Sequence, residues 1–300
     1  MNFPSFQNIK TDSIKNLYQS YNTVVDVLRL DLIHPIISGN KWFKLSPYLK
    51  EAFGQQKKII LTFGGAYSNH ILATAAAGKL NSYQSIGVIR GERPAKLSHT
   101  LTQAESFGMK LFFISREMYA HQIIPPVVYD QFPPEEIYTI NEGGYGELGK
   151  RGAKEILQYC NLGLYTHIIS ATGTGTTLAG LIASSLSGQR VIGISVFKNN
   201  ISLKIEIQNL LLNSLHDKFF LLHDYHFGGY AKKTAELIAF INDWYRQTSI
   251  PSDFVYTGKL FYAVDDLIKK KYFPAGSRLL VIHSGGLQGN SSLPKGALIF

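Results

Sequence analysis

The sequence is poor in cysteine and has no long apolar run. Its single cysteine, Cys160, excludes internal disulfides and multi-cysteine metal sites, and one thiol suits a reducing compartment. No apolar run reaches the roughly 18 residues needed to cross a bilayer. The first residues, MNFPSFQNIKTDS, contain no basic region followed by an apolar one, so we expect no signal peptide. These absences predict a cytoplasmic protein that does not enter a membrane.

The chain also lacks a concentrated charge of one sign. Lys and Arg number 30 against 21 Asp and Glu, a net charge of +9, but the densest basic runs are only residues 57–58 and 269–271. Such short runs do not form a nucleic-acid footprint, so a generally basic surface or attraction for a small anion is favoured. With 45% hydrophobic and 17% charged residues over 300 positions, the chain suits one large or two smaller globular domains.

Apolar, β-branched runs alternate with helix-like stretches along the chain. They predict strands near 23–33, 57–63, 83–90, 110–115, 166–172, 190–197 and 277–284, with helices near 68–80, 147–160 and 231–247. Continuous apolar strands alternating with helices predict an α/β fold with parallel sheets flanked by helices. We expect two domains: a smaller α/β domain at 46–145, inserted into a larger one formed by 1–45 and 146–300.

Ligands of such folds bind where strands end and glycine-rich turns begin helices. The loop SATGTGTTLAGL (170–181) has this form, because Gly173 and Gly175 permit close backbone approach while Thr174, Thr176 and Thr177 offer hydroxyls. Free N–H groups at a helix N-terminus favour an anion. The spacing matches neither a Walker A loop nor G-x-G-x-x-G, so it predicts a cradle for one terminal phosphate, with a plain turn as the alternative.

The loop FGGAYSNHILATAAAGKL (63–80) has the same strand–turn–helix form. Ser68 or Asn69 is a natural N-cap, and the N–H groups there suit a substrate carboxylate, although a plain cap is the simpler interpretation. A serine hydrolase is not supported because G-x-S-x-G is absent. Two other stretches, DFVYTGKL (253–260) and HSGGLQG (283–289), place hydroxyls beside glycines. The tract HDYH (223–226) lacks a third convincing metal ligand, so we predict no metal site.

The segment SGNKWFKL (38–45) joins these loops into one pattern. It is similar to G-N-K-x-R-K-L, as GGAYSNH is to G-G-x-x-S-N-H and ATGTGTTLAGL is to G-[ST]-G-G-T-x-A-G-L. NEGGYGELGKRG, FGGY, VYTGK and HSGG resemble later signatures in the same order. The sequence thus resembles the 1-aminocyclopropane-1-carboxylate deaminase/D-cysteine desulfhydrase family, pyridoxal-phosphate enzymes of the two-domain tryptophan-synthase-β-like fold (fold type II). The resemblance covers most of the chain and implies pyridoxal 5′-phosphate as cofactor, a small amino acid as substrate and a homodimer.

The resemblance also implies roles for the matching residues. Lys41 would hold the cofactor as a Schiff base and move protons, which suits an amine whose pKa is lowered by burial and by a nearby cation. The implied catalytic residues are Lys41, Ser68, Tyr230 and Tyr256; the cofactor-binding residues are Lys41, Lys44, Asn69, Gly173, Thr174, Gly175, Thr176, Thr177, Thr257 and Ser284; the substrate-binding residues are Ser68, Asn69, His70, Tyr230 and Tyr256.

Three positions depart from the family pattern. Phe43 replaces the usual arginine, a change expected to weaken a local salt bridge at most. Thr176 stands where the phosphate loop usually has glycine, and Ala-Lys-Lys follows Tyr230 in place of the usual glycine and proline. The last departure bears on which substrate the site accepts.

Two further positions favour one activity of the family. In the deaminases, glutamate follows the V-Y tyrosine and leucine follows the H-x-G-G histidine; here the residues are Thr257 and Ser284. A carboxylate keeps the pyridine nitrogen protonated for ring opening, whereas hydroxyls suit an easier β-elimination. We therefore predict a D-cysteine desulfhydrase-like lyase that deprotonates Cα and gives pyruvate, ammonia and sulfide. The alternatives are 1-aminocyclopropane-1-carboxylate deaminase and, from other classes, a catalytically silent cofactor- or amino-acid-binding protein and a nucleotide-binding α/β protein.

Overall fold

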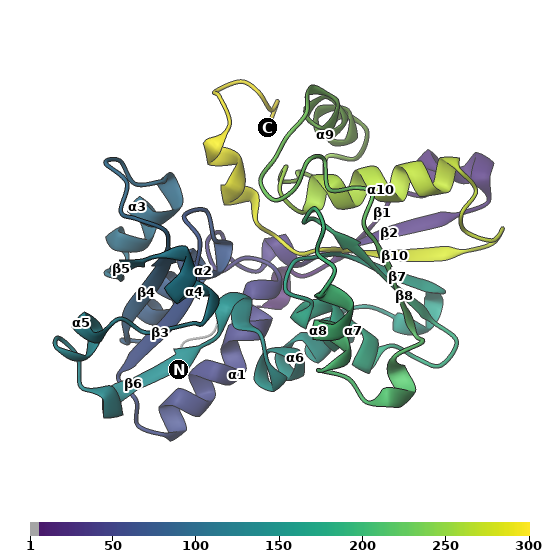
Figure 1. Ribbon diagram of the computed structural model, residues 1–300. Coiled ribbons are helices and arrows are strands. Elements are labelled where there is room, and N and C mark those ends of the chain that lie inside the picture. Colours follow the sequence, from purple (N-terminus) through teal and green to yellow (C-terminus); the bar gives the residue numbers. More distant parts are fainter. Residues whose placement is uncertain (1–5) are drawn as a thin grey trace.

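A computed structural model describes residues 6–300 and contains two β-sheets (Figure 1). The six-stranded sheet has the order β1-β2-β10-β7-β8-β9 and is parallel except for the antiparallel edge pair β1–β2. Its strands are β1 (Thr11–Ser13), β2 (Val24–Arg29), β7 (His167–Thr172), β8 (Arg190–Ser195), β9 (Phe219–Leu222) and β10 (Arg278–His283). The α/β class with parallel-rich sheets is confirmed.

The second sheet has four parallel strands in the order β5-β4-β3-β6. They are β3 (Ile59–Gly64), β4 (Gln84–Arg90), β5 (Lys110–Ile114) and β6 (Ile137–Ile140). All seven predicted strands are present. The three missed strands, β1, β6 and β9, have only three or four residues each, too few for a periodic signal.

Ten α-helices connect and cover the strands of the described chain. They are α1 (Asn40–Gly54), α2 (Asn69–Leu80), α3 (His99–Ser106), α4 (Arg116–Ala120), α5 (Pro126–Tyr129), α6 (Glu147–Lys154), α7 (Thr176–Ser184), α8 (Leu203–Gln208), α9 (Ala235–Thr248) and α10 (Thr257–Lys269). Helix α2 matches its prediction. The predicted 147–160 helix turns into a 3₁₀ segment after Lys154, and α9 begins later than predicted, because Thr234 caps it by accepting a bond from the Leu237 N–H.

The six-stranded sheet is buried on both faces, which explains its continuous apolar strands. Along β10, Leu280 packs in a cluster with Leu178 of α7, while the next residue, Val281, packs in a separate cluster with Leu260 of α10. Successive residues of a strand point to opposite faces. Figure 1 accordingly shows α9 and α10 over one face and α6 to α8 over the other.

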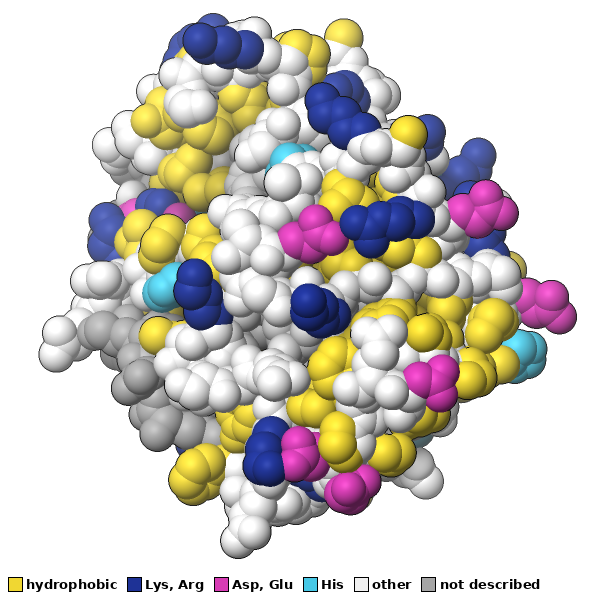
Figure 2. Space-filling view, turned by 90° about the vertical axis from the view of Figure 1, so that its left-hand side faces the viewer, with side chains coloured by type: hydrophobic (Ala, Val, Ile, Leu, Met, Phe, Trp, Pro, Cys, Tyr) yellow, Lys and Arg dark blue, Asp and Glu magenta, His cyan; other side chains and the backbone are white. Residues whose placement is uncertain are grey.

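The carboxyl ends of strands from both sheets approach each other at the middle of the molecule, where their loops lead into α2 and α7 (Figure 1). Helix α1 runs through the predicted domain border between residues 45 and 46, and the domain division itself stays a prediction. Within residues 6–300, no helix has the length and apolarity required to cross a membrane. On the face shown in Figure 2, basic and acidic side chains are interspersed.

Candidate active site

The predicted segments 38–45, 63–80, 170–181 and 283–289 all contribute residues to one cavity between the two sheets. The space between its lining atoms, including the mouth open to solvent, is about 970 Å³. The cavity brings together most of the predicted site residues: Lys41, Lys44, Ser68, Asn69, His70, Gly173, Thr174, Gly175, Thr177, Tyr230, Tyr256 and Ser284. Two predicted cofactor-binding residues, Thr176 and Thr257, are buried but do not line it.

Gly39 allows Lys41 to enter the cavity. Gly39 has φ +64°, and a Cβ there would lie 1.8 Å from the Ser284 carbonyl oxygen, so only glycine fits. The Asn40 N–H donates to that same oxygen at 3.2 Å. The first turn of α1 therefore lies directly against the loop after β10, and both of its lysines line the cavity.

Lys41 is a half-buried amine held by its neighbour. Its Nζ donates to Asn40 Oδ1 at 2.8 Å, and Asn40 Nδ2 in turn donates to Thr177 Oγ1 at 2.8 Å. Burial lowers the pKa of Lys41 to about 8, although the negative charge of Asp253 opposes this shift. The Asn40 amide thus couples the reactive amine to the predicted phosphate loop.

Lys44 supplies a second amine to the same cavity. Its Nζ donates to the Gly143 carbonyl, and burial, followed by the charge of Lys41, lowers its pKa well below the ordinary value. The neighbouring α7 begins after Gly175 (φ +81°) and has free N–H groups in its first turn. A bound anion would favour the charged forms of both amines beside this helix N-terminus, and a phosphate group meets this requirement.

The start of α2 forms the opposite wall and contains polar atoms without partners. Ser68 is the N-cap, because its Oγ accepts from the Ile71 N–H at 3.3 Å. Asn69 Oδ1 and His70 Nδ1 are buried and have no hydrogen-bond partner among residues 6–300. Buried polar groups are normally satisfied, so these orphaned atoms indicate a polar ligand.

The tautomer of His70 follows from its contacts. The Thr62 hydroxyl donates to the Ile140 carbonyl, so it accepts from His70 Nε2 at 3.0 Å. His70 is therefore protonated at Nε2, and Nδ1 is left as an acceptor. Burial and the charge of Lys44 lower the pKa of His70 well below its usual value, which keeps the ring neutral.

Aromatic rings close the cavity on the side of the six-stranded sheet. The Tyr256 ring lies 5.7 Å from Lys41 Nζ, and Tyr230 packs edge-on against it at 5.9 Å. Phe197 stacks on Tyr230 at 5.1 Å. Burial raises the pKa of both tyrosines, with their mutual contact adding to the shift for Tyr256, so both keep their hydroxyl protons at neutral pH.

Positions 284 and 257, which favoured desulfhydrase over deaminase activity in the sequence, carry hydroxyls with different surroundings. Ser284 lines the cavity, and its hydroxyl makes no hydrogen bond with any part of the chain that the structure describes. Thr257 donates to Asp253 Oδ1 at 2.6 Å and accepts from the Asp253 N–H at 2.8 Å. Ser284 is thus free to meet a ligand, whereas the Thr257 proton is already used.

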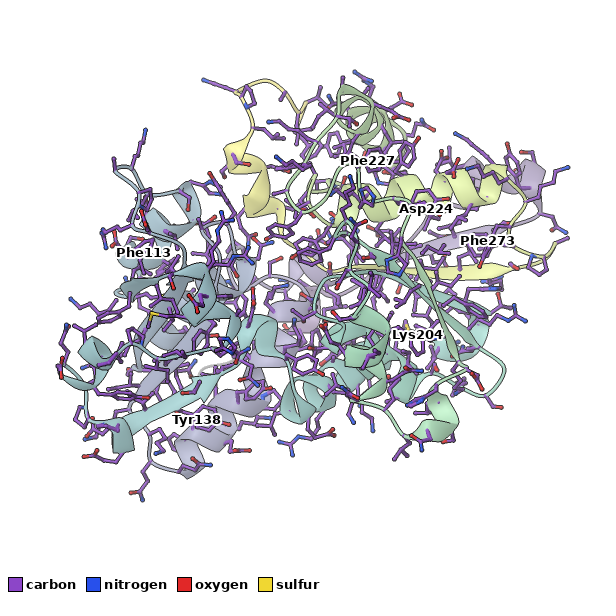
Figure 3. All side chains as sticks on the ribbon, in the orientation of Figure 1. Phe113, Tyr138, Lys204, Asp224, Phe227 and Phe273 are labelled. Atoms are coloured by element: carbon purple, nitrogen blue, oxygen red, sulfur yellow. The ribbon has the colours of Figure 1, made fainter. Side chains whose placement is uncertain are left out.

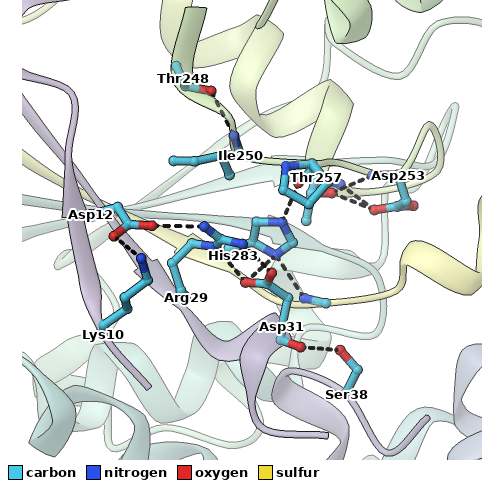
Figure 4. Close-up of polar contacts among 12 residues, drawn as sticks. Lys10, Asp12, Arg29, Asp31, Ser38, Thr248, Ile250, Asp253, Thr257 and His283 are labelled. Atoms are coloured by element: carbon cyan, nitrogen blue, oxygen red, sulfur yellow. Dashed lines mark hydrogen bonds and ion pairs between the residues drawn. The ribbon is translucent and has the colours of Figure 1, made fainter. Parts of the chain in front are cut away.

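A buried ionic network supports the loop that carries Ser284 (Figure 4). Arg29 makes a two-pronged contact with Asp31 at 2.8 and 2.7 Å and reaches Asp12 at 2.8 Å. Asp31 Oδ1 lies 3.3 Å from His283 Nδ1, and His283 Nε2 bonds the Pro251 carbonyl at 2.7 Å. This network fixes the end of β10 against the end of β2 and the segment that follows it.

The departures from the family pattern lie outside the cavity or at its edge. Phe43 is buried and packs against the rings of Phe6 and Tyr159 at 5.5 and 5.7 Å, so its side chain belongs to the core. The Thr176 hydroxyl lies 3.3 Å from that of Thr174. Neither Phe43 nor Thr176 lines the cavity.

Several lining residues were not singled out from the sequence. Asn40 lies inside the SGNKW motif and Glu142 inside NEGGYGE, so the motifs contained a signal for both. Arg90 and Phe197 end or follow apolar strands, and nothing local distinguishes them from ordinary loop residues. The residues that the structure describes contain no group of three or more His, Cys, Asp or Glu side chains that would hold a metal ion.

The chain is similar to known proteins over most of its length. No family model matches the chain. It is 30% identical over 282 residues to "Putative 1-aminocyclopropane-1-carboxylate deaminase" of Pyrococcus abyssi, covering 88% of this chain and 85% of that protein. It is 28% identical over 280 residues to the mitochondrial "Bifunctional D-cysteine desulfhydrase/1-aminocyclopropane-1-carboxylate deaminase" of Arabidopsis thaliana, covering 84% and 70%. The crystal structure of an ACC deaminase homologue superposes with a TM-score of 0.79 at 27% identity, covering 96% of this chain and 94% of that chain.

Proposed function

Because the chain belongs to the 1-aminocyclopropane-1-carboxylate deaminase/D-cysteine desulfhydrase family of pyridoxal-phosphate-dependent, fold type II enzymes, we propose that it is a desulfhydrase-like lyase. It would remove the Cα proton of a small amino acid and expel the β-substituent, giving pyruvate, ammonia and, from cysteine, sulfide. The alternative within the family is opening of the cyclopropane ring of 1-aminocyclopropane-1-carboxylate.

The observation that carries the proposal is the free hydroxyl of Ser284 in the cavity, with threonine and not glutamate at position 257. A serine hydroxyl donates a hydrogen bond to a pyridine nitrogen but does not keep a full proton there, as a carboxylate does. Elimination of a good leaving group needs less electron withdrawal than cleavage of a carbon–carbon bond. The free hydroxyl therefore favours the desulfhydrase reaction.

The residues present suit pyridoxal 5′-phosphate. The phosphate would be held by Lys44, the Thr177 hydroxyl and the backbone from Gly173 to Gly175, and Lys41 would attach the cofactor covalently. Asn69, with its unpaired Oδ1 and its amide donor, would contact the ring substituent. When bound, the cofactor supplies an electron sink that stabilises negative charge at Cα.

Lys41 is suited to take the proton from Cα and to deliver it to another atom of the substrate. With its pKa lowered to about 8, the neutral amine is populated roughly two orders of magnitude more at neutral pH than in a free lysine. Ser68 and the free N–H groups of α2 would hold the substrate carboxylate, which fixes Cα beside this amine. The aromatic wall of Tyr230 and Tyr256 would exclude water from the reacting atoms.

The proposal is tested with a substrate panel. Protein loaded with pyridoxal phosphate is given D-cysteine, L-cysteine, D-serine and 1-aminocyclopropane-1-carboxylate, and pyruvate, sulfide and 2-oxobutyrate are measured. We expect pyruvate and sulfide from a cysteine enantiomer. Product from the cyclopropane amino acid alone would overturn the argument from Ser284. The homodimer and the cytoplasmic location stay predictions.

A further inference from the structure

A second cavity adjoins the first. The space between its lining atoms, mouth included, is about 650 Å³, and two of its lining residues, Asn69 and Tyr230, also line the first cavity. Its other walls come from Tyr67 in the loop before α2, from Phe254 and Val255 before α10, and from the segment between β9 and α9. The two spaces are therefore separated by the side chains that they share.

Tyr230 forms part of this partition. Its ring is held by Phe197 and by Tyr256 on the side of the first cavity, whereas its hydroxyl reaches the Tyr67 carbonyl at 3.5 Å, long enough for that hydrogen bond to be weak. The backbone around it includes Phe227 and Ala231, both non-glycine residues with φ +51°. Phe227 lies beside α10, where its ring packs on Tyr262 at 4.8 Å (Figure 3). Phe227 therefore holds the base of the segment against α10, whereas the contact between Tyr230 and Tyr67 is a single weak hydrogen bond.

The second cavity combines apolar walls with one cation. Phe254 and Val255 are almost fully buried, and the ring of Tyr67 is about half exposed at 49%. Lys233 Nζ lies 5.8 Å from the Phe254 ring centroid, and no acidic side chain lines the space. Such a lining accepts an aromatic or aliphatic body that ends in a negative charge.

The proposed arrangement of the substrate directs its side chain towards this space. Its carboxylate would lie at the start of α2 and its amino group near Lys41, and the cofactor phosphate would occupy the side of α7. The remaining direction from Cα faces Tyr256 and Tyr230, and the second cavity lies behind Tyr230.

We propose that the second cavity is a subsite for the β-substituent, so that the enzyme accepts S-substituted cysteines whose sulfur carries an apolar or aromatic group with an anionic end. This rests on the proposed elimination. The Cα proton is removed, the Cβ–S bond breaks with its electron pair on sulfur, and the thiolate takes up a proton. Overall, S-substituted cysteine and water give the thiol, pyruvate and ammonium, with no external oxidant or reductant.

The test compares S-(4-carboxyphenyl)cysteine, S-phenylcysteine and cysteine, each as both enantiomers. We expect turnover of the aryl substrates, and we expect Lys233→Glu to lower kcat/KM for the carboxylated substrate about fivefold relative to S-phenylcysteine. The matched control is Lys232→Glu, which alters the neighbouring exposed lysine that does not line the cavity, and it should leave this ratio unchanged. Ser292→Trp, at the exposed rim, should lower turnover of both aryl substrates relative to cysteine.

A binding measurement separates this inference from the proposed reaction. The product thiol 4-mercaptobenzoate is titrated calorimetrically into the wild type, Lys233→Glu and Lys232→Glu. If binding weakens only in Lys233→Glu but cysteine is not turned over, the subsite stands and the elimination is wrong. If cysteine is turned over while neither 4-mercaptobenzoate binding nor the substrate ratio responds to Lys233→Glu, the subsite is overturned.

Discussion

Lys41 and Lys259 have the same lowered pKa, about 8, yet they lie in very different surroundings. In both, burial lowers the pKa and Asp253 opposes the shift. Lys259 is fully buried in α10 and donates to the carbonyls of His226 and Gly229 at 2.8 and 2.7 Å. Lys41 has one side-chain acceptor and otherwise faces the cavity.

The comparison shows that a lowered pKa alone does not identify a catalytic lysine. Buried groups have shifted pKa values wherever they are desolvated, including in structural contacts. What distinguishes Lys41 is an open cavity with unsatisfied polar atoms around it. Lys259 uses its donors to hold the segment that carries Tyr230, so we regard it as a positioning residue.

The largest expected effect comes from removing the Lys41 amine. Lys41→Ala should lower turnover at least about 10³-fold, because the base is lost, and should abolish the visible absorbance of covalently attached cofactor. Lys259→Met should retain that absorbance. Spectra of the two reconstituted variants give the answer, and persistence of the absorbance in Lys41→Ala would refute the assignment of this lysine.

The role of Lys41 was implied by the family resemblance of its motif, whereas nothing in the sequence pointed to the role of Lys259. The strands and turns around Lys41 have local signals: buried β-branched runs, glycines before helices, and hydroxyls at helix starts. The partners of Lys259 are backbone carbonyls about 30 residues away, and carbonyls have no sequence identity. Thr257 differs for another reason: its hydroxyl was expected to contact the cofactor, but it bonds the carboxylate of Asp253, four residues earlier in the same stretch.

Strands whose residues are all buried were predictable from the sequence. Strands that are defined only by their hydrogen bonds to a neighbouring strand were not. Strand β3 is buried at all six positions, and its apolar run was recognised. Strand β1 is the polar sequence TDS at a sheet edge, paired with β2 but without an apolar pattern. Arg90 was missed as a lining residue because no local pattern marks it, and only the tertiary arrangement brings the end of β4 to the cavity.

The next effect tests Lys259 as a positioning residue. Lys259→Met leaves two carbonyls without a donor, so we expect unfolding to become easier by about 2–4 kcal/mol. The Tyr230 segment should loosen, and kcat/KM should fall about tenfold more than the loss of folded protein explains. The matched control is Lys269→Met, on the same helix but exposed and paired only with Asp265, which should change stability by less than about 1 kcal/mol. Denaturant unfolding and steady-state kinetics of both variants test this prediction. If Lys259→Met and Lys269→Met change stability and kcat/KM equally, Lys259 is not a positioning residue.

A pH experiment separates the two lysines without a large structural change. Covalent capture of pyridoxal phosphate requires the neutral Lys41 amine. Because the folded pKa is lowered to about 8, the neutral fraction rises about tenfold per pH unit below that value and levels off above it. The rate of cofactor capture by the apoprotein, followed by absorbance from pH 6 to 9.5, should show this profile in the wild type and in Lys259→Met alike. A flat profile, or a midpoint that moves with Lys259→Met, would assign the titration to another group.

The smallest effects are expected at the two hydroxyls, which repeat the contrast between a cavity-facing group and a buried structural group. Ser284→Ala removes a hydroxyl that makes no hydrogen bond with the described residues, so stability should be nearly unchanged while kcat falls about tenfold through the lost bond to the cofactor ring. Thr257→Val removes the donor to Asp253, and this carboxylate also accepts from the N–H groups of Val255, Tyr256 and Thr257. Loss of a charge-assisted bond in that buried cluster should cost about 1.5–3 kcal/mol of stability, with a smaller effect on kcat. The opposite result would be a shift in the absorbance of the bound cofactor in Thr257→Val but not in Ser284→Ala. Thr257, and not Ser284, would then contact the cofactor ring, as the sequence predicted, although Thr257 does not line the cavity.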